Sequence, residues 1–227
     1  MSEFKTIETN HNDLLEGIKS AAKAGGRNPS DVKLVAVSKI QPDARIQAAL
    51  DLGQTVFGEN RVQEAQARWG DRFASHRKDI ELRLIGPLQT NKAESAVSLF
   101  DVVETVDREK LLKALVKAAD KVGQRPRLYV QVNTGAEAQK SGLAPAEVSD
   151  FVKLMRETYG WEPEGLMSIP PVGEAASPHF WLLSNLAMQC GLTKLSMGMS
   201  ADYETAVKMG ATSVRVGSGL FGARLKG

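Results

Sequence analysis

The sequence is poor in the residue types that build disulfides and zinc sites. It has one cysteine, Cys190, so an intrachain disulfide is excluded. Its three histidines, His11, His76 and His179, lie far apart and lack the spacing of zinc ligands, both to one another and to Cys190. A lone cysteine in an apolar helical stretch is typical of a small core residue. We therefore predict no metal site.

Apolar runs long enough to cross a bilayer are also absent, and the N-terminus opens into polar sequence without the apolar core of a signal peptide. The 29 Lys and Arg residues nearly balance the 27 Asp and Glu residues, which gives a net charge of +2 without any long basic run. Nucleic-acid binding depends on clustered phosphate contacts, so it is not indicated. We expect a cytoplasmic protein with neither nucleic acid nor membrane among its partners.

What the chain does have is a regular alternation of short β-rich runs and amphipathic helical windows. The β-rich runs are nearly continuous in apolar residues, which is typical of parallel strands covered on both faces. A first helical window carries Ile7, Leu14 and Ile18 on one face, and the strand–helix units follow it. The predicted strands are 32–39, 55–60, 82–86, 102–106, 128–133, 165–169, 194–200 and 213–216.

This order predicts a single (β/α)8 TIM barrel with an extra N-terminal helix, forming one domain over residues 1–227. The length of 227 residues and the hydrophobic content of 42% suffice for the core of such a domain. The main alternative is a doubly wound open sheet, which rarely needs so many regular units. No linker, charge block or low-complexity segment divides the chain.

In a barrel, the functional site lies at the carboxyl ends of the strands. Lys39 ends the first predicted strand, on the same face as Val35 and Val37. Desolvation at the rim of an apolar barrel favours the neutral amine, the form that attacks a carbonyl to give a Schiff base. The alternative is a lysine that extends from a strand end into solvent, and this residue alone favours that interpretation.

Small and hydroxyl-bearing residues follow the last two predicted strands, as Gly198-Met199-Ser200 and Gly217-Ser218-Gly219. Barrels often bind phosphate in these two loops, against backbone N–H groups at the start of a short helix. Segment 217–222 also matches the dinucleotide pattern G-x-G-x-x-G, but the βαβ unit that this pattern requires does not follow it. Because both loops share the feature, we favour a phosphate site over two tight turns that need glycine only for conformation.

Arg215 lies within the last predicted strand, and a buried arginine is costly unless it is paired. Two interpretations stay open: an ion pair with a neighbouring strand, for example with Glu59, and a donor aimed at a ligand ring or phosphate. A Schiff-base lysine facing a phosphate site describes two chemistries. One is a pyridoxal 5′-phosphate protein, and the other is a class I aldolase acting on a sugar phosphate. A scaffolding protein would need neither group.

Several segments, taken in order from about Val32 to Arg224, resemble the pyridoxal phosphate homeostasis protein family. They are Ala36-Val37-Ser38-Lys39, Gly58-Glu59-Asn60, 85–92, Lys140-Ser141-Gly142-Leu143, Gly165-Leu166-Met167, 195–200 and 214–218. The resemblance implies a fold similar to the barrel domain of bacterial alanine racemase. It also implies pyridoxal 5′-phosphate held as a Schiff base, a link to vitamin B6 balance, and no established enzymatic turnover.

The same resemblance assigns roles to individual residues. Lys39 matches the Schiff-base lysine, and Arg215 matches the arginine that faces the pyridine nitrogen. Ser200, Gly217 and Ser218 match the phosphate-binding positions. The full predicted cofactor-binding set is Lys39, Asn60, Met199, Ser200, Arg215, Gly217 and Ser218, and no catalytic residue is assigned.

Three further positions complete the comparison with the family. Asn60 matches a polar residue at the cofactor's edge. The pair Leu82-Arg83 stands where the family usually has Trp-His, a departure that concerns the barrel mouth and not the cofactor site. Alanine racemase takes its second base, a tyrosine, from another domain, and no tyrosine here matches that role. Tyr203, beside Ser200, is the only one that we predict near the site.

An arginine opposite the pyridine nitrogen keeps that nitrogen unprotonated and so weakens carbanion chemistry. We therefore predict an intracellular carrier or buffer of pyridoxal 5′-phosphate, with cofactor-free pyridoxal enzymes as candidate recipients. The alternative is a pyridoxal-dependent enzyme on small amino acids, racemase- or lyase-like, with Lys39 as its sole base. We expect a monomer or a weak dimer. Lys92 and Lys140 are candidates for a second pyridoxal site, although solvated loop lysines are the favoured interpretation.

Overall fold

A computed structural model describes residues 3–137 and 139–223. Within these ranges, eight parallel strands form a closed barrel in chain order, and the last strand is hydrogen-bonded to the first. The strands are β1 (Lys33–Val37), β2 (Val56–Glu59), β3 (Glu81–Leu84), β4 (Val102–Val106), β5 (Arg127–Val132), β6 (Gly165–Ser168), β7 (Lys194–Ser196) and β8 (Ser213–Val216). The predicted (β/α)8 barrel is confirmed, and the open-sheet alternative is wrong.

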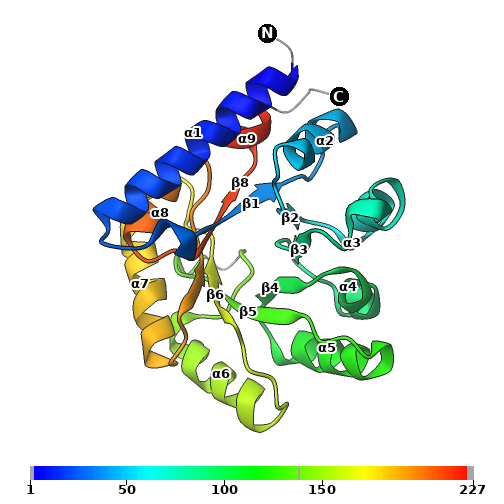
Figure 1. Cartoon of the computed structure of the whole chain (residues 1–227). Helices are drawn as coiled ribbons and strands as arrows, with labels where there is room; N and C mark the ends of the chain where they lie inside the picture. The colour runs from blue at the N-terminus through cyan, green and yellow to red at the C-terminus, as the bar shows by residue number, and fades with distance from the viewer. Residues whose placement is uncertain (1–2, 138, 224–227) are drawn as a thin grey trace.

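Helices surround the strands on all sides (Figure 1). The α-helices are α1 (Glu3–Ala24), α2 (Asp43–Asp51), α3 (Val62–Ala65), α4 (Ala93–Leu99), α5 (Glu109–Val122), α6 (Val148–Glu157), α7 (Ala176–Gln189), α8 (Tyr203–Lys208) and α9 (Ser218–Phe221). Shorter helical turns are η1 (Pro29–Asp31), η2 (Gln66–Arg72), η3 (Ala74–His76), η4 (Thr90–Lys92) and η5 (Pro145–Glu147).

The main hydrophobic core lies between the barrel and its helices. Leu34 and Ala36 of β1 belong to this core, whereas Val35, between them, faces the barrel interior, where a Cβ added at Gly58 would approach its Cγ1 to 3.0 Å. This two-residue alternation is what a strand covered on both faces requires. Because the strands are parallel and the barrel is closed, the residues that follow each strand form a ring at one end of the barrel.

The barrel interior contains charged and hydroxyl side chains, although the sequence predicts an apolar barrel. An apolar cluster of three buried side chains lies there, made of Val102, Tyr129 and Met167. The other buried interior residues include Arg83, Glu104, Ser196, Ser213 and Arg215. Buried charges are stable only when they are paired and hydrogen-bonded, and these side chains are connected to one another.

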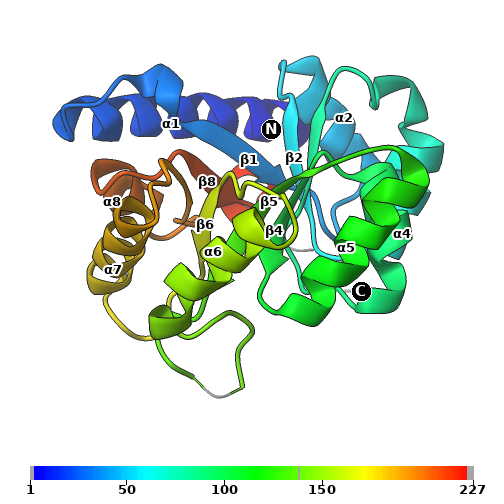
Figure 2. The same cartoon turned by 90° about the horizontal axis from the view of Figure 1, so that it is seen from below.

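Helix α1 precedes the barrel and packs on its outside against α2, α8 and α9, as Figures 1 and 2 show. Its buried face carries Ile7, Leu14 and Ile18, which are the residues that its periodicity predicts. The Asn10 Nδ2 atom donates to the Leu220 carbonyl oxygen of α9 at 2.9 Å. The extra N-terminal helix is therefore confirmed, and it braces the segment that follows β8.

The segment after β2 differs from the single α-helix that its spacing predicts. Helix α3 ends at Ala65, and η2 continues as a wider π-helix over Gln66–Arg72. Adjacent residues of an α-helix point in different directions. Here the side chains of both Arg68 and Trp69 reach the Glu59 carboxylate, so the wider turn is matched by shared polar contacts.

Residues 3–137 and 139–223 contain neither a membrane-spanning helix nor a group of side chains arranged as metal ligands. No helix there has the length and apolar character needed to cross a membrane. No group of three or more His, Cys, Asp or Glu side chains in those ranges is arranged to hold a metal ion.

Candidate functional site

Lys39 lies in a tight turn at the carboxyl end of β1. The Ser38 N–H donates to the Gly58 carbonyl oxygen at 3.0 Å, and the Gln41 N–H donates to the Ser38 carbonyl oxygen at 3.1 Å. Lys39 is partly buried, and Ile40 beside it has a φ of 60° with an exposed side chain. A β-branched residue at positive φ is rare, and such backbone strain concentrates at functional sites. The turn is thus held at both ends around the lysine.

A buried ion pair lies against this turn. The Arg68 Nη1 atom is 2.6 Å from Glu59 Oε1 and 3.0 Å from the Ser38 carbonyl oxygen, and Arg68 Nη2 donates to the Gln41 carbonyl oxygen at 2.9 Å. The Glu59 Oε1 atom also accepts from Ser38 Oγ at 2.7 Å. One guanidinium therefore fixes the residues on both sides of Lys39, and a fully buried carboxylate balances its charge.

The loops after β7 and β8 meet beside β1. Ser200 Oγ accepts from the Gly219 N–H at 3.2 Å and lies 3.4 Å from Ser218 Oγ. A Cβ added at Gly217 would be 3.5 Å from Val37 Cβ, two residues before Lys39, so the loop after β8 borders the lysine turn. Backbone N–H groups and two hydroxyls in one place form an arrangement that suits an anion.

Arg215 is buried beneath this mouth. Its Nη1 donates to Ser196 Oγ at 2.6 Å, and its Nη2 donates to the Ser168 carbonyl oxygen at 2.8 Å. Burial lowers the pKa of Arg215, and the nearby Glu104 carboxylate, 3.9 Å away, opposes that shift. Glu59, the ion-pair partner that the sequence suggested for Arg215, is the wrong one, because that carboxylate is taken by a helical arginine.

A second arginine continues the interior pairing toward the other end of the barrel. Arg83 Nη1 donates to Glu104 Oε1 at 2.8 Å, and Arg83 Nε donates to Glu81 Oε1 at 2.6 Å. Burial alone would lower the pKa of Arg83, but Glu104 and Glu81 raise it. Burial alone would raise the pKa of Glu81, but Arg83, Lys33 and Arg127 bring it down to about 2.

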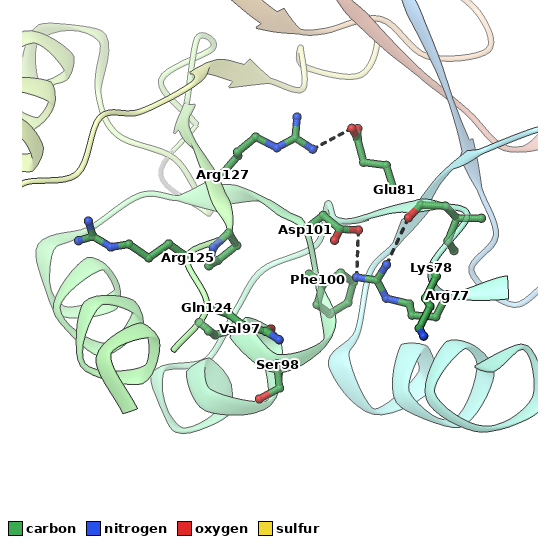
Figure 3. A pocket seen from close by; sticks show the side chains of 12 residues that line it. Arg77, Lys78, Glu81, Val97, Ser98, Phe100, Asp101, Gln124, Arg125 and Arg127 are labelled. Atoms are coloured by element: carbon green, nitrogen blue, oxygen red, sulfur yellow. Dashed lines mark hydrogen bonds and ion pairs between the residues drawn. The ribbon is translucent and has the colours of Figure 1, made fainter. Parts of the chain in front are cut away.

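The Glu81 end of this network lines a cavity (Figure 3). The figure shows the Arg127 guanidinium directed at the Glu81 carboxylate, with Nη2 and Oε2 2.8 Å apart, on the wall of a 780 Å³ cavity. The cavity lies at the amino-terminal ends of β3 and β5, away from Lys39. This cavity therefore lies at the opposite end of the barrel from the lysine turn and the loops after β7 and β8.

Asn60 lies at the mouth between two cavities of 690 Å³ and 310 Å³ that both include it in their linings. Its Oδ1 atom is buried and has no hydrogen-bond partner among residues 3–137 and 139–223. Lys92 lines the larger of the two and Lys140 the smaller. Lys140 Nζ is paired with Glu137 Oε2 at 2.5 Å.

Met199 and Tyr203 flank the loop after β7. The Met199 side chain is 37% exposed, and its N–H donates to Asp202 Oδ1 at 2.6 Å, so this residue shapes the loop through its backbone. The Tyr203 hydroxyl lies against α1, where a Cβ added at Gly17 would be 2.2 Å from it. The prediction that the Tyr203 side chain lies near the site is therefore wrong, because its ring fills the contact between α8 and α1.

Sequence reasoning missed Arg68, Glu104 and Ser196. Arg68 carried no signal, since a single arginine on an amphipathic helix is usually solvated. Glu104 offered one weak signal, a carboxylate in the middle of an apolar strand, which requires a buried cation nearby.

The fold and these contacts define a class of protein: a closed parallel (β/α)8 barrel with a lysine-bearing turn after β1 beside two loops rich in glycine and serine after β7 and β8. A family model described as alanine racemase, N-terminal domain, matches residues 18–225. The pyridoxal phosphate homeostasis protein of Vibrio alginolyticus is 38% identical, with 97% of this chain and 99% of the relative covered. The Escherichia coli protein of the same name is 34% identical, with 96% and 97% covered.

Solved structures of related proteins have the same fold as this chain. PipY of Synechococcus elongatus, in a structure with PLP bound, is 37% identical, covers 90% of this chain and all of its own, and has a TM-score of 0.76. Alanine racemase from Bartonella henselae has a TM-score of 0.73 at 16% identity, covers 97% of this chain and 59% of its own, and shows the fold alone. The chain belongs to the alanine racemase N-terminal domain family and, within it, to the pyridoxal phosphate homeostasis proteins.

Proposed function

We propose that this protein binds pyridoxal 5′-phosphate covalently through Lys39 and acts in pyridoxal phosphate homeostasis as a carrier or buffer of the cofactor. One observation carries the proposal: the lysine turn after β1 and the anion-binding loop after β8 lie side by side, since β1 and β8 are hydrogen-bonded neighbours. An amine and a phosphate site that border one another would suit the two ends of one small molecule. The names of the curated relatives support the same cofactor.

The residues present fit the cofactor. At Gly219, an added Cβ would be 2.9 Å from Val216 Cγ1 and 3.3 Å from Ser200 Oγ, so a side chain there would clash with β8 and crowd the Ser200 hydroxyl. Among the described residues, Ser168 Oγ is buried and has no hydrogen-bond partner, and it lies next to the carbonyl oxygen that Arg215 contacts. The loop after β8 thus requires glycine at this position, and the site contains a polar group that is incompletely satisfied.

When bound, the cofactor would supply an aldehyde, and Lys39 Nζ would be the amine joined to it with loss of one water, in a bond that another amine could exchange. The protein's residues do the rest. Gly217, Ser218 and Ser200 hold the phosphate, and Asn60 lies at the cofactor's edge with an unpaired acceptor. Arg215 places a fixed positive charge on the ring side, which disfavours a proton on the pyridine nitrogen.

The second candidate is a pyridoxal-dependent enzyme on small amino acids. Racemisation needs bases on both faces of the substrate, and the Tyr203 hydroxyl lies against α1. The homeostasis names of the relatives describe no reaction. A class I aldolase has no support from the relatives. Steady turnover of alanine by the loaded protein, lost in Lys39→Ala, would establish the enzyme in place of the carrier.

The attachment point can be located chemically. The loaded protein is reduced with borohydride and digested, and the modified peptide is identified by mass spectrometry. The proposal expects the label on the peptide with Lys39 in the parent, in Lys92→Ala and in Lys140→Ala. Stoichiometric label on another lysine in the parent would contradict it.

The carrier role has its own test. The loaded protein is mixed with the cofactor-free form of a pyridoxal enzyme, in the presence of a phosphatase that destroys free cofactor. Reactivation that survives the phosphatase supports delivery to recipient enzymes, and reactivation abolished by it would leave buffering alone. We also infer that the protein acts in the cytoplasm as one barrel domain. We further infer that it is a monomer or weak dimer, and sedimentation across a concentration series tests this oligomeric state.

A further inference from the structure

Five side chains inside the barrel form one continuous chain of contacts. Arg215 Nη1 donates to Ser196 Oγ at 2.6 Å, and Ser196 Oγ donates to Glu104 Oε2 at 2.6 Å. The other carboxylate oxygen, Glu104 Oε1, accepts from Arg83 Nη1 at 2.8 Å, and Arg83 Nη2 pairs with Glu81 Oε1 at 2.5 Å. The chain links the ring side of the proposed cofactor site to the opposite end of the barrel.

Glu104 is shared unequally between its two arginines. Its side chain is fully buried, and it contacts Arg83 directly, whereas Arg215 is 3.9 Å away and is reached through Ser196. Asp202 adds a further negative charge toward Arg215. In a medium of low dielectric constant, a buried carboxylate approaches whichever cation remains available to it. Arg83 therefore competes with Arg215 for Glu104.

We propose that Arg83 is a positioning residue that holds the Glu104 carboxylate away from Arg215, so that Arg215 keeps its positive charge available to the ring of the bound cofactor. The proposal rests on the function proposed above. Without Arg83, Arg215 would be the one cation close to Glu104 in the described part of the chain. The pair would then close, and the positive potential on the ring side would fall.

Arg83 is itself anchored from outside the site. Glu81 Oε2 accepts from Lys33 Nζ and from Arg127 Nη2, each at 2.8 Å. The pair of Glu81 with Arg127 lies at the cavity wall in Figure 3. The Glu81 side chain is 17% exposed, so it can be changed with less risk to folding than the interior residues. A substitution there tests the chain from the end opposite to Lys39.

The readout is the midpoint pH at which the visible band of the loaded protein changes. A positive charge near the bound cofactor disfavours the cofactor's protonated form and so lowers this midpoint. We expect Arg83→Gln to move this midpoint to higher pH by about half a unit, about a threefold change in proton affinity. Arg83→Lys keeps the charge and should titrate like the parent. Glu104→Gln should move the midpoint to lower pH. The matched control is Arg77→Gln, since Arg77 pairs with Asp101 on the same cavity wall outside the chain of contacts.

A double-mutant cycle separates positioning from a direct field. If Arg83 acts through Glu104, Arg83→Gln shifts the midpoint in the parent and has little effect in the Glu104→Gln background. Glu81→Gln should lower the midpoint, because Arg83 then pairs with Glu104 alone, and this effect should also vanish in Glu104→Gln. In a crystal structure of cofactor-free Arg83→Gln, the distance from Arg215 Nη1 to Glu104 Oε2 should fall below its present 3.9 Å.

Two results overturn the proposal: an unchanged midpoint in folded Arg83→Gln, and equal shifts with and without Glu104. If Arg83→Gln does not fold, Glu81→Gln takes its place in the test. A midpoint shift caused by Glu81→Gln in the parent that is lost in the Glu104→Gln background supports the proposal. No midpoint shift, or equal shifts in both backgrounds, contradicts it. A parent without a visible band contradicts the proposed function itself and removes this inference with it, whereas a normal parent band with unshifted variants contradicts the inference alone.

Discussion

Arg68 and Glu59 form an ion pair that is closed to solvent and lies directly against the turn that carries Lys39. Their Nη1 and Oε1 atoms are 2.6 Å apart, and the side chains are 7% and 0% exposed. The guanidinium also holds the carbonyl oxygens of Ser38 and Gln41, one on each side of Lys39 and Ile40. The ion pair thereby fixes the backbone on both sides of Lys39.

Replacing Arg68 by methionine should weaken both stability and cofactor attachment. It leaves the Glu59 carboxylate buried without its cation, which costs about 3–5 kcal/mol of the free energy of unfolding. Arg72→Met is the control, because the pair that Arg72 makes with Asp43 is about half exposed and is worth at most about 1 kcal/mol. Urea unfolding of the cofactor-free proteins measures both values. Equal losses in the two variants would show that the buried pair has no special importance.

The two serines of the anion-binding loops should act on the phosphate and not on the aldehyde. Ser200→Ala and Ser218→Ala each remove a hydroxyl from the cradle, and we expect the dissociation constant for pyridoxal 5′-phosphate to rise about tenfold in each. Binding of pyridoxal, which lacks the phosphate, should change little. Equilibrium dialysis with both ligands checks this, with Ser98→Ala on α4 as the control. Equal weakening for both ligands would place these serines outside the phosphate site.

The Glu81 carboxylate should make stability depend on acid pH. Its pKa lies at about 2 in the folded protein, against an ordinary 4.5, so the ionised carboxylate stabilises the folded state above about pH 4.5. That contribution is lost as the pH falls from 4.5 toward 2. Urea unfolding of the cofactor-free protein across this range should show a slope that Glu81→Gln reduces and that Glu94→Gln, at an exposed pair with Lys121, leaves unchanged. An identical slope in Glu81→Gln would contradict the assignment.

The positive φ of Ile40 predicts a stabilising substitution. Asparagine tolerates the left-handed region better than a β-branched residue, and the Ile40 side chain is 66% exposed, so its replacement sacrifices little burial. We expect Ile40→Asn to raise the free energy of unfolding by about 1 kcal/mol. Ile40→Val, which is also β-branched, is the control and should gain nothing. A gain in Ile40→Val as large as that in Ile40→Asn would argue against backbone strain.

Much of the fold could be predicted because the relevant signals are local. Apolar runs such as 128–133 alternate with windows of helical period, and parallel strands joined by helices leave few architectures. The segment 66–72 was the exception, since a π-helix depends on what its side chains contact. Arg68 and Trp69 share one carboxylate on another element, and spacing along the chain does not record that.

The candidate site also has a part that could be predicted from the sequence and a part that could not. Lys39, Ser200 and Gly217 follow strands, and the rule that strand ends meet at one face brings them together. The pairing of Arg83 with Glu104 could not be predicted, because it depends on the stagger of β3 against β4 around the closed barrel. The direction of the Tyr203 ring was likewise decided by the packing of α1, a helix outside the repeating pattern.

The central claim is that Lys39 holds the cofactor, and the visible absorption spectrum tests it most directly. The purified parent and Lys39→Ala are compared before and after addition of pyridoxal 5′-phosphate, with Lys140→Ala as the matched control. We predict a visible band in the parent and in Lys140→Ala that Lys39→Ala lacks, even with added cofactor. A normal band in Lys39→Ala, or none in the loaded parent, would contradict the account.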